Sequence, residues 1–167
     1  MNAPVLETDR LRLRMLQAED FDEYAAIHVD SEVTRFTVRA QLSRYDAWRH
    51  MAMIAGHWVL RGYGMWGVFE KSSGHLVGRV GFYYPDGWPA FELGWTLGRN
   101  FWGKGYATEA ARRCLDYAFD EMGRDHVISL IDPANVASIR VAERIGETVE
   151  GEVEVAGYRS LVYGITR

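Results

Sequence analysis

A glycine-rich turn at residues 103–108, Gly-Lys-Gly-Tyr-Ala-Thr, has the residue types that bind an anion through the main chain. Gly103 and Gly105 carry no side chain and Ala107 carries only a methyl group, so backbone N–H groups can converge there. A helix predicted to begin near Tyr106 or Ala107 adds its own unpaired N–H groups and the positive end of its dipole. We therefore expect this turn to hold a phosphate or a pyrophosphate.

A P-loop is the first phosphate-binding pattern that the turn could represent. Gly98 and the pair Gly103-Lys104 match the spacing GxxxxGK. The next residue is Gly105, however, so the hydroxyl that would hold Mg²⁺ is missing. The turn also follows several predicted strands, and no acidic strand is available as a partner for the metal. We reject this interpretation.

A dinucleotide-binding turn is the second pattern. Residues 103–108 begin as GxGxxG but end in threonine, which makes the match incomplete. Asp125 and Asp132 lie near the distance at which an acidic residue would bind a ribose, but Asp132 is followed by Pro133. The dinucleotide interpretation stays as an alternative.

The composition restricts the class of protein. The 167 residues suit a single domain spanning 1–167, and the formal charge of −4 disfavours a nucleic-acid-binding protein.

Cys114 is the only cysteine, so no internal disulfide can form, and we interpret it as a core residue. His50 and His57 lie seven apart on one predicted helix, too far for a shared metal, and no metal site is predicted. Without a signal peptide or a long apolar run, we expect no membrane association and a cytoplasmic location.

Hydrophobic periodicity and turn residues predict the order β-α-α-β-β-β-α-β-α-β-β. This order indicates an α/β (α+β) protein, with a mixed sheet and helices on both faces. Residues 30–42 show no clear pattern. The predicted elements are Arg10–Leu16, Ala18–Val29, Arg44–Leu60, Met65–Phe69, Leu76–Tyr84, Phe91–Leu97, the helix from Tyr106 or Ala107 to about Met122, Val127–Ile131, Asn135–Ile145, Val149–Val155 and Tyr158–Thr166.

Three segments together form a recognisable pattern: LETDRLRLR at 6–14, FWGKGYATEA at 101–110 and NVASIRVAERIG at 135–146. They resemble the GNAT superfamily of acetyl-CoA-dependent N-acetyltransferases, and most of all the branch of ribosomal-protein N-terminal acetyltransferases. The resemblance covers Leu6 to Thr166 and implies a GNAT-like, mostly antiparallel central sheet. One position departs from the family loop Gln/Arg-x-x-Gly-x-Gly/Ala, because Asn100 stands first. Whether Asn100 or the adjacent Arg99 contributes to phosphate binding is therefore open.

The resemblance also implies how the donor, acetyl-CoA, is bound. In the family, the pantetheine arm pairs with the strand that matches Phe91–Leu97, and a backbone N–H of this strand helps to stabilise the developing oxyanion. Gly94 and Gly98 fit such a close approach, although a bulge or a turn would explain them as well. The cofactor-binding residues that follow from the resemblance are Trp95, Leu97, Trp102, Gly103, Lys104, Gly105, Tyr106, Ala107, Thr108 and Asn135.

Protonation of the leaving thiolate separates branches of the superfamily. Some members place a tyrosine seven residues after the asparagine, where this chain has Ala142. The branch that this chain resembles places a serine three residues after it, and Ser138 matches. Ser138 could otherwise be an ordinary residue of the first helical turn. Asn135 could be the N-cap of its own helix, and the resemblance implies that it also touches the pantetheine or holds the split between strands, which is compatible with capping.

The general base is the least determined residue. Glu92 alternates with Phe91 and Leu93, so its side chain is predicted on the face shared with Gly94 and Thr96. If this face borders the acceptor, Glu92 could take the proton of the amine directly or through a water. Further candidates are Glu152, Glu154 and a chain of waters, and Trp88 is a candidate for the acceptor pocket.

The sequence thus predicts an acetyl-CoA-dependent N-acetyltransferase in which an amine attacks the bound thioester directly in a ternary complex. The acceptor is a primary amine, either a protein N-terminus or a small molecule, and segments 30–45 and 84–90 do not choose between them. The alternative is a non-catalytic acyl-CoA-binding or regulatory module of the same fold. A homodimer is compatible with the sequence, which does not determine the oligomeric state.

Overall fold

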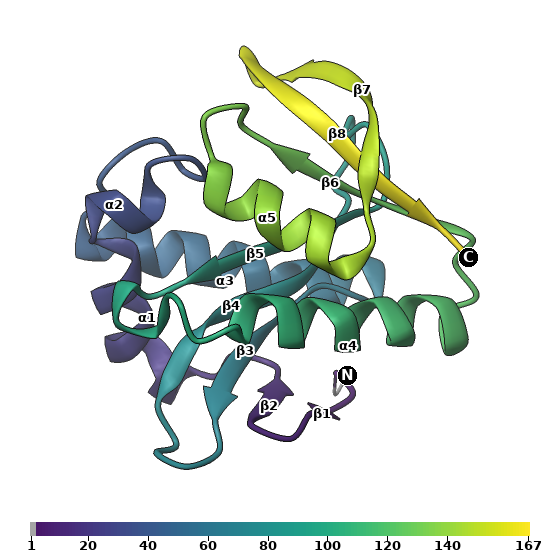
Figure 1. Ribbon diagram of the computed structural model, residues 1–167. Coiled ribbons are helices and arrows are strands. Elements are labelled where there is room, and N and C mark those ends of the chain that lie inside the picture. Colours follow the sequence, from purple (N-terminus) through teal and green to yellow (C-terminus); the bar gives the residue numbers. More distant parts are fainter. Residues whose placement is uncertain (1–2) are drawn as a thin grey trace.

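One twisted, open sheet organises the chain, and the computed structural model describes residues 3–167 (Figure 1). Its eight strands follow the order β1-β2-β3-β4-β5-β6-β8-β7. The strands are β1 (Leu6–Glu7), β2 (Leu11–Arg14), β3 (Met65–Glu70), β4 (Leu76–Tyr83), β5 (Glu92–Leu97), β6 (His126–Ile131), β7 (Thr148–Val155) and β8 (Tyr158–Thr166). The α-helices are α1 (Phe21–His28), α2 (Ser31–Thr34), α3 (Arg44–Arg61), α4 (Tyr106–Asp120) and α5 (Val136–Ile145), with short 3₁₀ turns at Ala18–Asp20 and Arg99–Phe101.

Helices cover both faces of the sheet, as the sequence predicts. In Figure 1, α4 and α5 lie in front of the sheet and α3 lies behind it. α4 buries Ala110, Cys114 and Ala118, whose small side chains let the helix approach the central strands closely. On the other face, the α1 and α3 residues Tyr24 and Ile54 pack in a second core cluster. The predicted mixed α/β class with a mostly antiparallel sheet is therefore confirmed.

Residues 30–42, which show no pattern in sequence, contain α2 and an irregular stretch after it. Asp30 caps α2 by accepting a hydrogen bond from the Glu32 N–H at 3.0 Å. Arg39 then adopts a left-handed backbone with φ of 58°, and its guanidinium forms an ion pair with Asp132 at 2.8 Å. This ion pair connects the stretch to the loop that follows β6.

The central strands β5 and β6 are parallel, and they remain together for one pair of residues only. Glu92 is opposite Ile128, and the Ile128 N–H donates to the Phe91 carbonyl at 3.1 Å. On its other side β5 stays paired with β4 from Glu92 to Leu97. The β6-facing edge of β5 beyond Leu93 is therefore free of any strand in the described part of the chain, which opens a gap in the middle of the sheet.

None of the helices within residues 3–167 combines the length and the apolar character needed to cross a lipid bilayer. Cys114 is a fully buried residue of α4, and burial raises the pKa of its thiol. A thiol that is neither accessible nor ionised is a core residue, in agreement with the interpretation from sequence.

Candidate functional site

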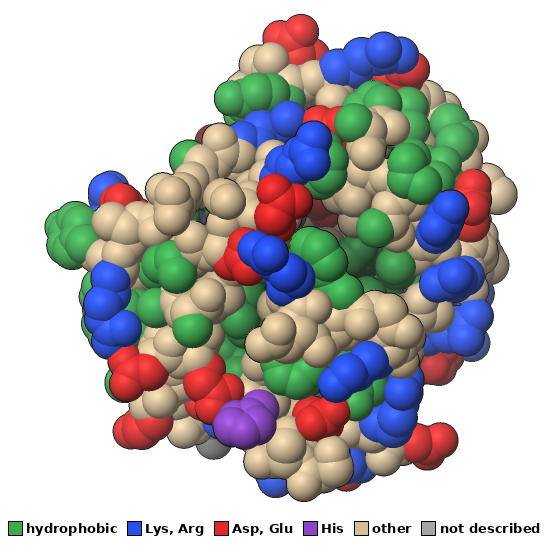
Figure 2. Space-filling view, turned by 60° about the vertical axis from the view of Figure 1, so that its left-hand side comes forward, with side chains coloured by type: hydrophobic (Ala, Val, Ile, Leu, Met, Phe, Trp, Pro, Cys, Tyr) green, Lys and Arg blue, Asp and Glu red, His purple; other side chains and the backbone are tan. Residues whose placement is uncertain are grey.

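Two cavities meet at the gap between β5 and β6. The loop cavity, about 530 Å³, lies beside the glycine-rich turn and α5. The Glu92 cavity, about 410 Å³, lies under α3 and the residues after α2. Figure 2 shows a hollow near the middle of one face, with hydrophobic side chains inside it and charged side chains along its border. The residues that line both cavities are Phe36, Thr37, Trp95, Thr96, Asn135 and Ser138.

The glycine-rich turn has the conformation that an anion cradle requires. Gly103 and Gly105 have φ values of 75° and 80°, which residues with a Cβ rarely adopt. Gly105 is the N-cap of α4 and bonds no side chain there. The N–H groups of the six residues 103–108 have no hydrogen-bond partner in the described structure. This row of unpaired donors at a helix N-terminus can bind a phosphate.

Arg10 holds the turn from the side opposite the loop cavity. Its guanidinium donates to the Lys104 carbonyl at 2.9 Å and pairs with Glu109 at 2.6 Å. The Lys104 carbonyl is therefore turned away from the unpaired N–H groups. Arg10 lies in the bend just before β2, and its contacts show that it orients the turn.

Most of the residues that the resemblance assigns to donor binding border one cavity. Those lining the loop cavity are Trp95, Leu97, Trp102, Gly103, Gly105, Tyr106, Ala107, Thr108 and Asn135. Lys104 does not line it, because its ammonium lies over the rings of Phe101 and Tyr106, at 5.2 and 5.8 Å from their centroids. The main chain of Lys104, not its side chain, is thus available to a ligand.

Arg99 and Asn100, which the sequence leaves open as phosphate contacts, lie elsewhere. The Arg99 guanidinium pairs with Asp30 at 2.5 Å, and neither Arg99 nor Asn100 lines the loop cavity. Three other arginines do line it: Arg35, Arg140 and Arg144. Their sequence context gave no signal, since arginines at such spacings are common on solvated helix faces.

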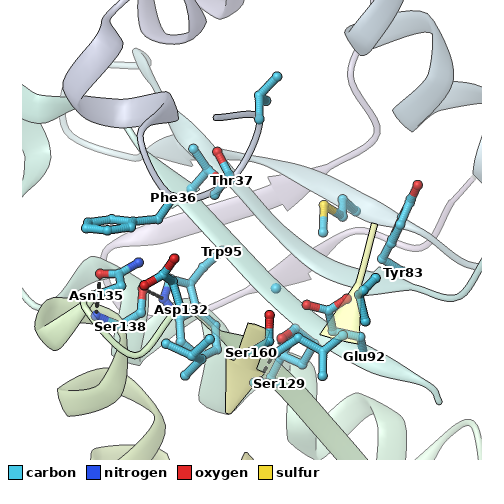
Figure 3. A pocket seen from close by; sticks show the side chains of 18 of the residues that line it. Phe36, Thr37, Tyr83, Glu92, Trp95, Ser129, Asp132, Asn135, Ser138 and Ser160 are labelled. Carbon is cyan, nitrogen blue, oxygen red and sulfur yellow. Dashed lines mark hydrogen bonds between the residues drawn. The ribbon is translucent and has the colours of Figure 1, made fainter. Parts of the chain in front are cut away.

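Asn135 and Ser138 lie at the junction of the two cavities (Figure 3). The Asn135 Oδ1 accepts from the Ser138 N–H at 3.2 Å, which confirms that Asn135 is the N-cap of α5. The Trp95 Nε1–H donates to the Ser138 Oγ at 3.2 Å. Because this bond occupies only a lone pair of the hydroxyl, the Ser138 proton remains available to a group in the junction.

Glu92 lines the Glu92 cavity together with Gly94 and Thr96, on the face predicted from their alternation. Trp88, from the preceding loop, also lines the cavity and donates its Nε1–H to the Glu92 carboxylate at 2.6 Å. Burial raises the pKa of Glu92 to about 7, although the hydrogen bond from Trp88 opposes this rise. A carboxyl group with this pKa can accept a proton near neutral pH.

The two alternative bases do not reach the site. Glu152 and Glu154 are exposed on β7, and neither lines the Glu92 cavity. The Glu152 carboxylate is paired with Arg159 at 2.5 Å. Their interpretation as candidate bases is therefore wrong, because both side chains point to solvent from a strand at the edge of the sheet.

Ser129 and Glu147 stabilise the place where β5 and β6 separate, and the sequence analysis missed both. The Ser129 Oγ lies 2.8 Å from the Leu93 carbonyl oxygen and 2.9 Å from the Glu147 Oε1. The carbonyl can only accept, so the single hydroxyl proton goes to Leu93 and the proton shared with Glu147 must come from the carboxyl group. Burial raises the pKa of Glu147 to about 8, which favours this protonated form.

Within residues 3–167, the structure contains no group of three or more His, Cys, Asp or Glu side chains arranged to hold a metal ion. The two histidines next to the Glu92 cavity serve other purposes. His57 contacts the Tyr63 carbonyl through Nδ1 at 2.8 Å and accepts from the Tyr84 N–H at 3.1 Å. His50 contacts the Tyr24 hydroxyl at 2.7 Å.

Comparison with known proteins gives a consistent result. A family model described as "Acetyltransferase (GNAT) domain" matches residues 10–148. The uncharacterized protein YkkB of Bacillus subtilis is 36% identical over 158 residues, 87% of each chain. The uncharacterized N-acetyltransferase YnaD of the same organism is 30% identical over 146 residues, 87% of this chain and 84% of its own. The crystal structure of an acetyltransferase from Agrobacterium tumefaciens has a TM-score of 0.88 at 30% identity, and covers 100% of this chain and 96% of that one.

The buried carboxyl of Glu147 predicts a pH-dependent stability. Its pKa is raised from 4.5 to about 8 in the folded state, so its contribution to stability is complete below pH 4.5 and is lost as the pH rises towards 8. Glu147→Gln should remove this slope, and near pH 9 it should exceed the wild type in unfolding free energy by about 2 kcal/mol. Urea unfolding from pH 4 to 9 measures the difference. The exposed Glu143→Gln is the control, and an equal slope in all three proteins would contradict the protonated carboxyl.

Proposed function

This chain belongs to the GNAT family and is an N-acetyltransferase, and from this membership we propose how its residues transfer an acetyl group from acetyl-CoA to a primary amine. The observation that carries the proposal is the junction of the two cavities beside β5. A donor in the loop cavity and an acceptor in the Glu92 cavity would meet at Trp95, Asn135 and Ser138. Both reactants can then be bound at once, as direct attack in a ternary complex requires.

The loop cavity suits the donor. The unpaired N–H groups of 103–108 would bind the pyrophosphate of CoA. The third phosphate of CoA would receive positive charge from Arg35, Arg140 and Arg144. The free edge of β5 beyond Leu93 would pair with the amide groups of the pantetheine arm. An N–H of this edge would stabilise the charge that develops on the thioester oxygen.

Proton transfer would use one residue from each side of the junction. Glu92 would take a proton from the ammonium form of the acceptor, directly or through a water, so that the neutral nitrogen can attack the acetyl carbon. As the new C–N bond forms and the C–S bond breaks, Ser138 would donate its proton to the departing sulfur, and the second proton that the acetylated nitrogen loses would restore the Ser138 hydroxyl. The hydrogen bond from Trp95 keeps the Ser138 hydroxyl oriented for this donation.

A thiol-release assay with acetyl-CoA and a panel of amines and N-terminal peptides tests the proposal. Release with at least one acceptor, together with the acetylated amine in mass spectrometry, would support it. Binding of CoA without release on any acceptor would instead support a non-catalytic acyl-CoA-binding module. A crystal soaked with CoA would locate its sulfur relative to Ser138 and Glu92.

Gly105→Glu should lower the affinity for acetyl-CoA by at least about 100-fold, because a residue with a Cβ strains the left-handed backbone that forms the anion cradle, and its negative charge lies next to the bound phosphates. Calorimetry with CoA measures this loss. Gly62→Glu is the matched control, since Gly62 has a similar φ of 77° and open space around it at the end of α3. Undiminished affinity in Gly105→Glu would contradict the role of the turn.

Ser138→Ala should lower kcat by about 10- to 100-fold and leave the affinity for acetyl-CoA nearly unchanged, because a hydrogen bond to the leaving thiolate is lost. Trp95→Phe, which removes the indole N–H from Ser138 together with the second ring of the side chain, should cause a smaller loss of kcat. Ser73→Ala, in an exposed turn, serves as the control. If kcat of Ser138→Ala equals that of the wild type, Ser138 does not take part in the reaction.

Glu92→Gln should depress kcat/KM most strongly near and above pH 7, where the wild-type carboxylate is ionised. Below pH 6 the two proteins should converge, because Glu92 is then protonated. At pH 9 and above the variant should recover in part, since the amine loses its proton to solvent. Rate profiles from pH 5.5 to 10 test this, with the exposed Glu154→Gln as control. A wild-type-to-variant ratio that is constant with pH would exclude Glu92 as the base.

A further inference from the structure

Arg79 on β4 is a buried cation without a counter-charge, and it lines the Glu92 cavity. The residue is 6% exposed. Within residues 3–167, no carboxylate lies within the 4.0 Å of an ion pair from its guanidinium, and its Nε has no hydrogen-bond partner. Its Nη1 points at the sulfur of Met65, which is a weak acceptor. Most of the hydrogen-bonding capacity of this side chain is thus unused.

The polar side chains nearest Arg79 carry no charge that could offset its own, although the Tyr24 hydroxyl lies close enough to interact with the guanidinium. The Glu92 carboxylate also acts on Arg79, but only across the cavity and without an ion pair. Burial lowers the pKa of His28 to about 3 and of His50 to about 2, and it raises the pKa of Tyr24 to about 12. These three side chains are therefore neutral near pH 7. Thr96, opposite Arg79 on β5, has a buried hydroxyl without a partner. Because an isolated buried charge is costly, an anion from outside the chain is the expected partner.

The sheet places Arg79 and Glu92 at two ends of one cavity. Arg79 is opposite Thr96 and Tyr83 is opposite Glu92, so both charged residues project from the same face, at positions about 13 Å apart along the strands. Gly94 lies between them, and the methyl group of Met65 comes within 3.0 Å of the position that a Cβ would take there, so Met65 forms the floor of the cavity at this point. The cavity therefore presents a positive group and a proton acceptor to the same ligand.

We infer that the acceptor is a compact amine carrying a carboxylate, and that Arg79 binds this carboxylate while Glu92 receives the ammonium proton. The inference rests on the proposed function and names its substrate class. A planar guanidinium can donate two parallel hydrogen bonds to a carboxylate, and the hydroxyl of Thr96 can add a third. The volume of about 410 Å³ lies at the lower end of small-molecule sites and favours an amino-acid-like acceptor over a peptide.

Calorimetry in the presence of desulfo-CoA, which cannot donate an acyl group, tests the inference. The ligands are free amino acids and their α-carboxamides. A peptide amide whose sequence begins Ser-Glu is titrated separately, as an example of a peptide acceptor. The wild type should bind the best acid about 10- to 100-fold more tightly than its amide. Arg79→Met should lose this preference and keep its affinity for desulfo-CoA. Comparing acid and amide in both proteins cancels the different basicity of their amines.

Two further variants complete the test. Arg12→Met removes an exposed arginine of the same sheet and should keep the full preference for acids. Arg79→Lys should keep part of it, because the charge remains while the paired donors are lost. Circular dichroism and thermal melting check that Arg79→Met folds, as expected when a methionine replaces an unpaired buried charge. If Arg79→Met does not fold, the inference is tested instead by comparing the binding of acids and amides in the wild type and in Arg79→Lys.

Several results would overturn the inference. They are equal binding of acids and amides by the wild type, no binding of any acid, an unchanged preference in Arg79→Met, or tighter Arg79-dependent binding of the peptide. Failure of the proposed function is distinguishable, because it concerns thiol release from acetyl-CoA and not binding. A protein that prefers acids but releases no thiol contradicts only the reaction. One that releases thiol without this preference contradicts only the assignment of Arg79.

Discussion

The separation of β5 from β6 after a single pair of residues is the constraint on which the site depends. Two parallel strands that stayed paired would satisfy each other's backbone groups and leave no room between them. Here the hydroxyl of Ser129 bonds the Leu93 carbonyl, and beyond that point the edge of β5 that faces β6 pairs with no strand. The same separation creates the junction of the two cavities and leaves a strand edge that an extended ligand can pair with.

Burial of polar groups around this gap sets their protonation. Glu92 and Glu147 lie away from bulk water, which raises the pKa of each carboxyl towards or above neutrality. Glu147 bonds Ser129 through one carboxyl oxygen and has a structural role, while Glu92 faces the cavity. Arg79 retains a positive charge in the same environment. The region thus combines a proton acceptor, a neutral carboxyl group and a cation within a small part of the sheet.

The glycine-rich turn and the separated strands depend on each other. Arg10, on the segment between β1 and β2, bonds both the turn and Glu109 of α4, so the N-terminal part of the chain holds the helix end in place. α4 in turn packs on β4 and β5 through small buried residues. The glycine-rich turn and the end of β5 therefore border the same cavity, and an extended ligand can use both.

Local patterns in the sequence were sufficient for the order of elements apart from β1 and α2, for the glycine-rich turn, for the N-cap at Asn135 and for the face on which Glu92 lies. Each depends on residue type and short spacing, through alternation, helical periodicity or the conformational freedom of glycine. Residues 30–42 gave no such signal because their conformation depends on long-range contacts, such as the ion pair between Arg39 and Asp132.

Only the tertiary structure decided which charged residues share a cavity. In the sequence, Arg79 looks like an ordinary residue of an alternating strand. No local pattern shows that the side chains next to it in the folded protein are neutral. Glu152 and Glu92 look alike in sequence, yet one is exposed at the sheet edge and the other lies beside the central gap. Burial and the pairing of charges arise from contacts between distant segments, and these physical quantities determine whether a side chain can do chemistry.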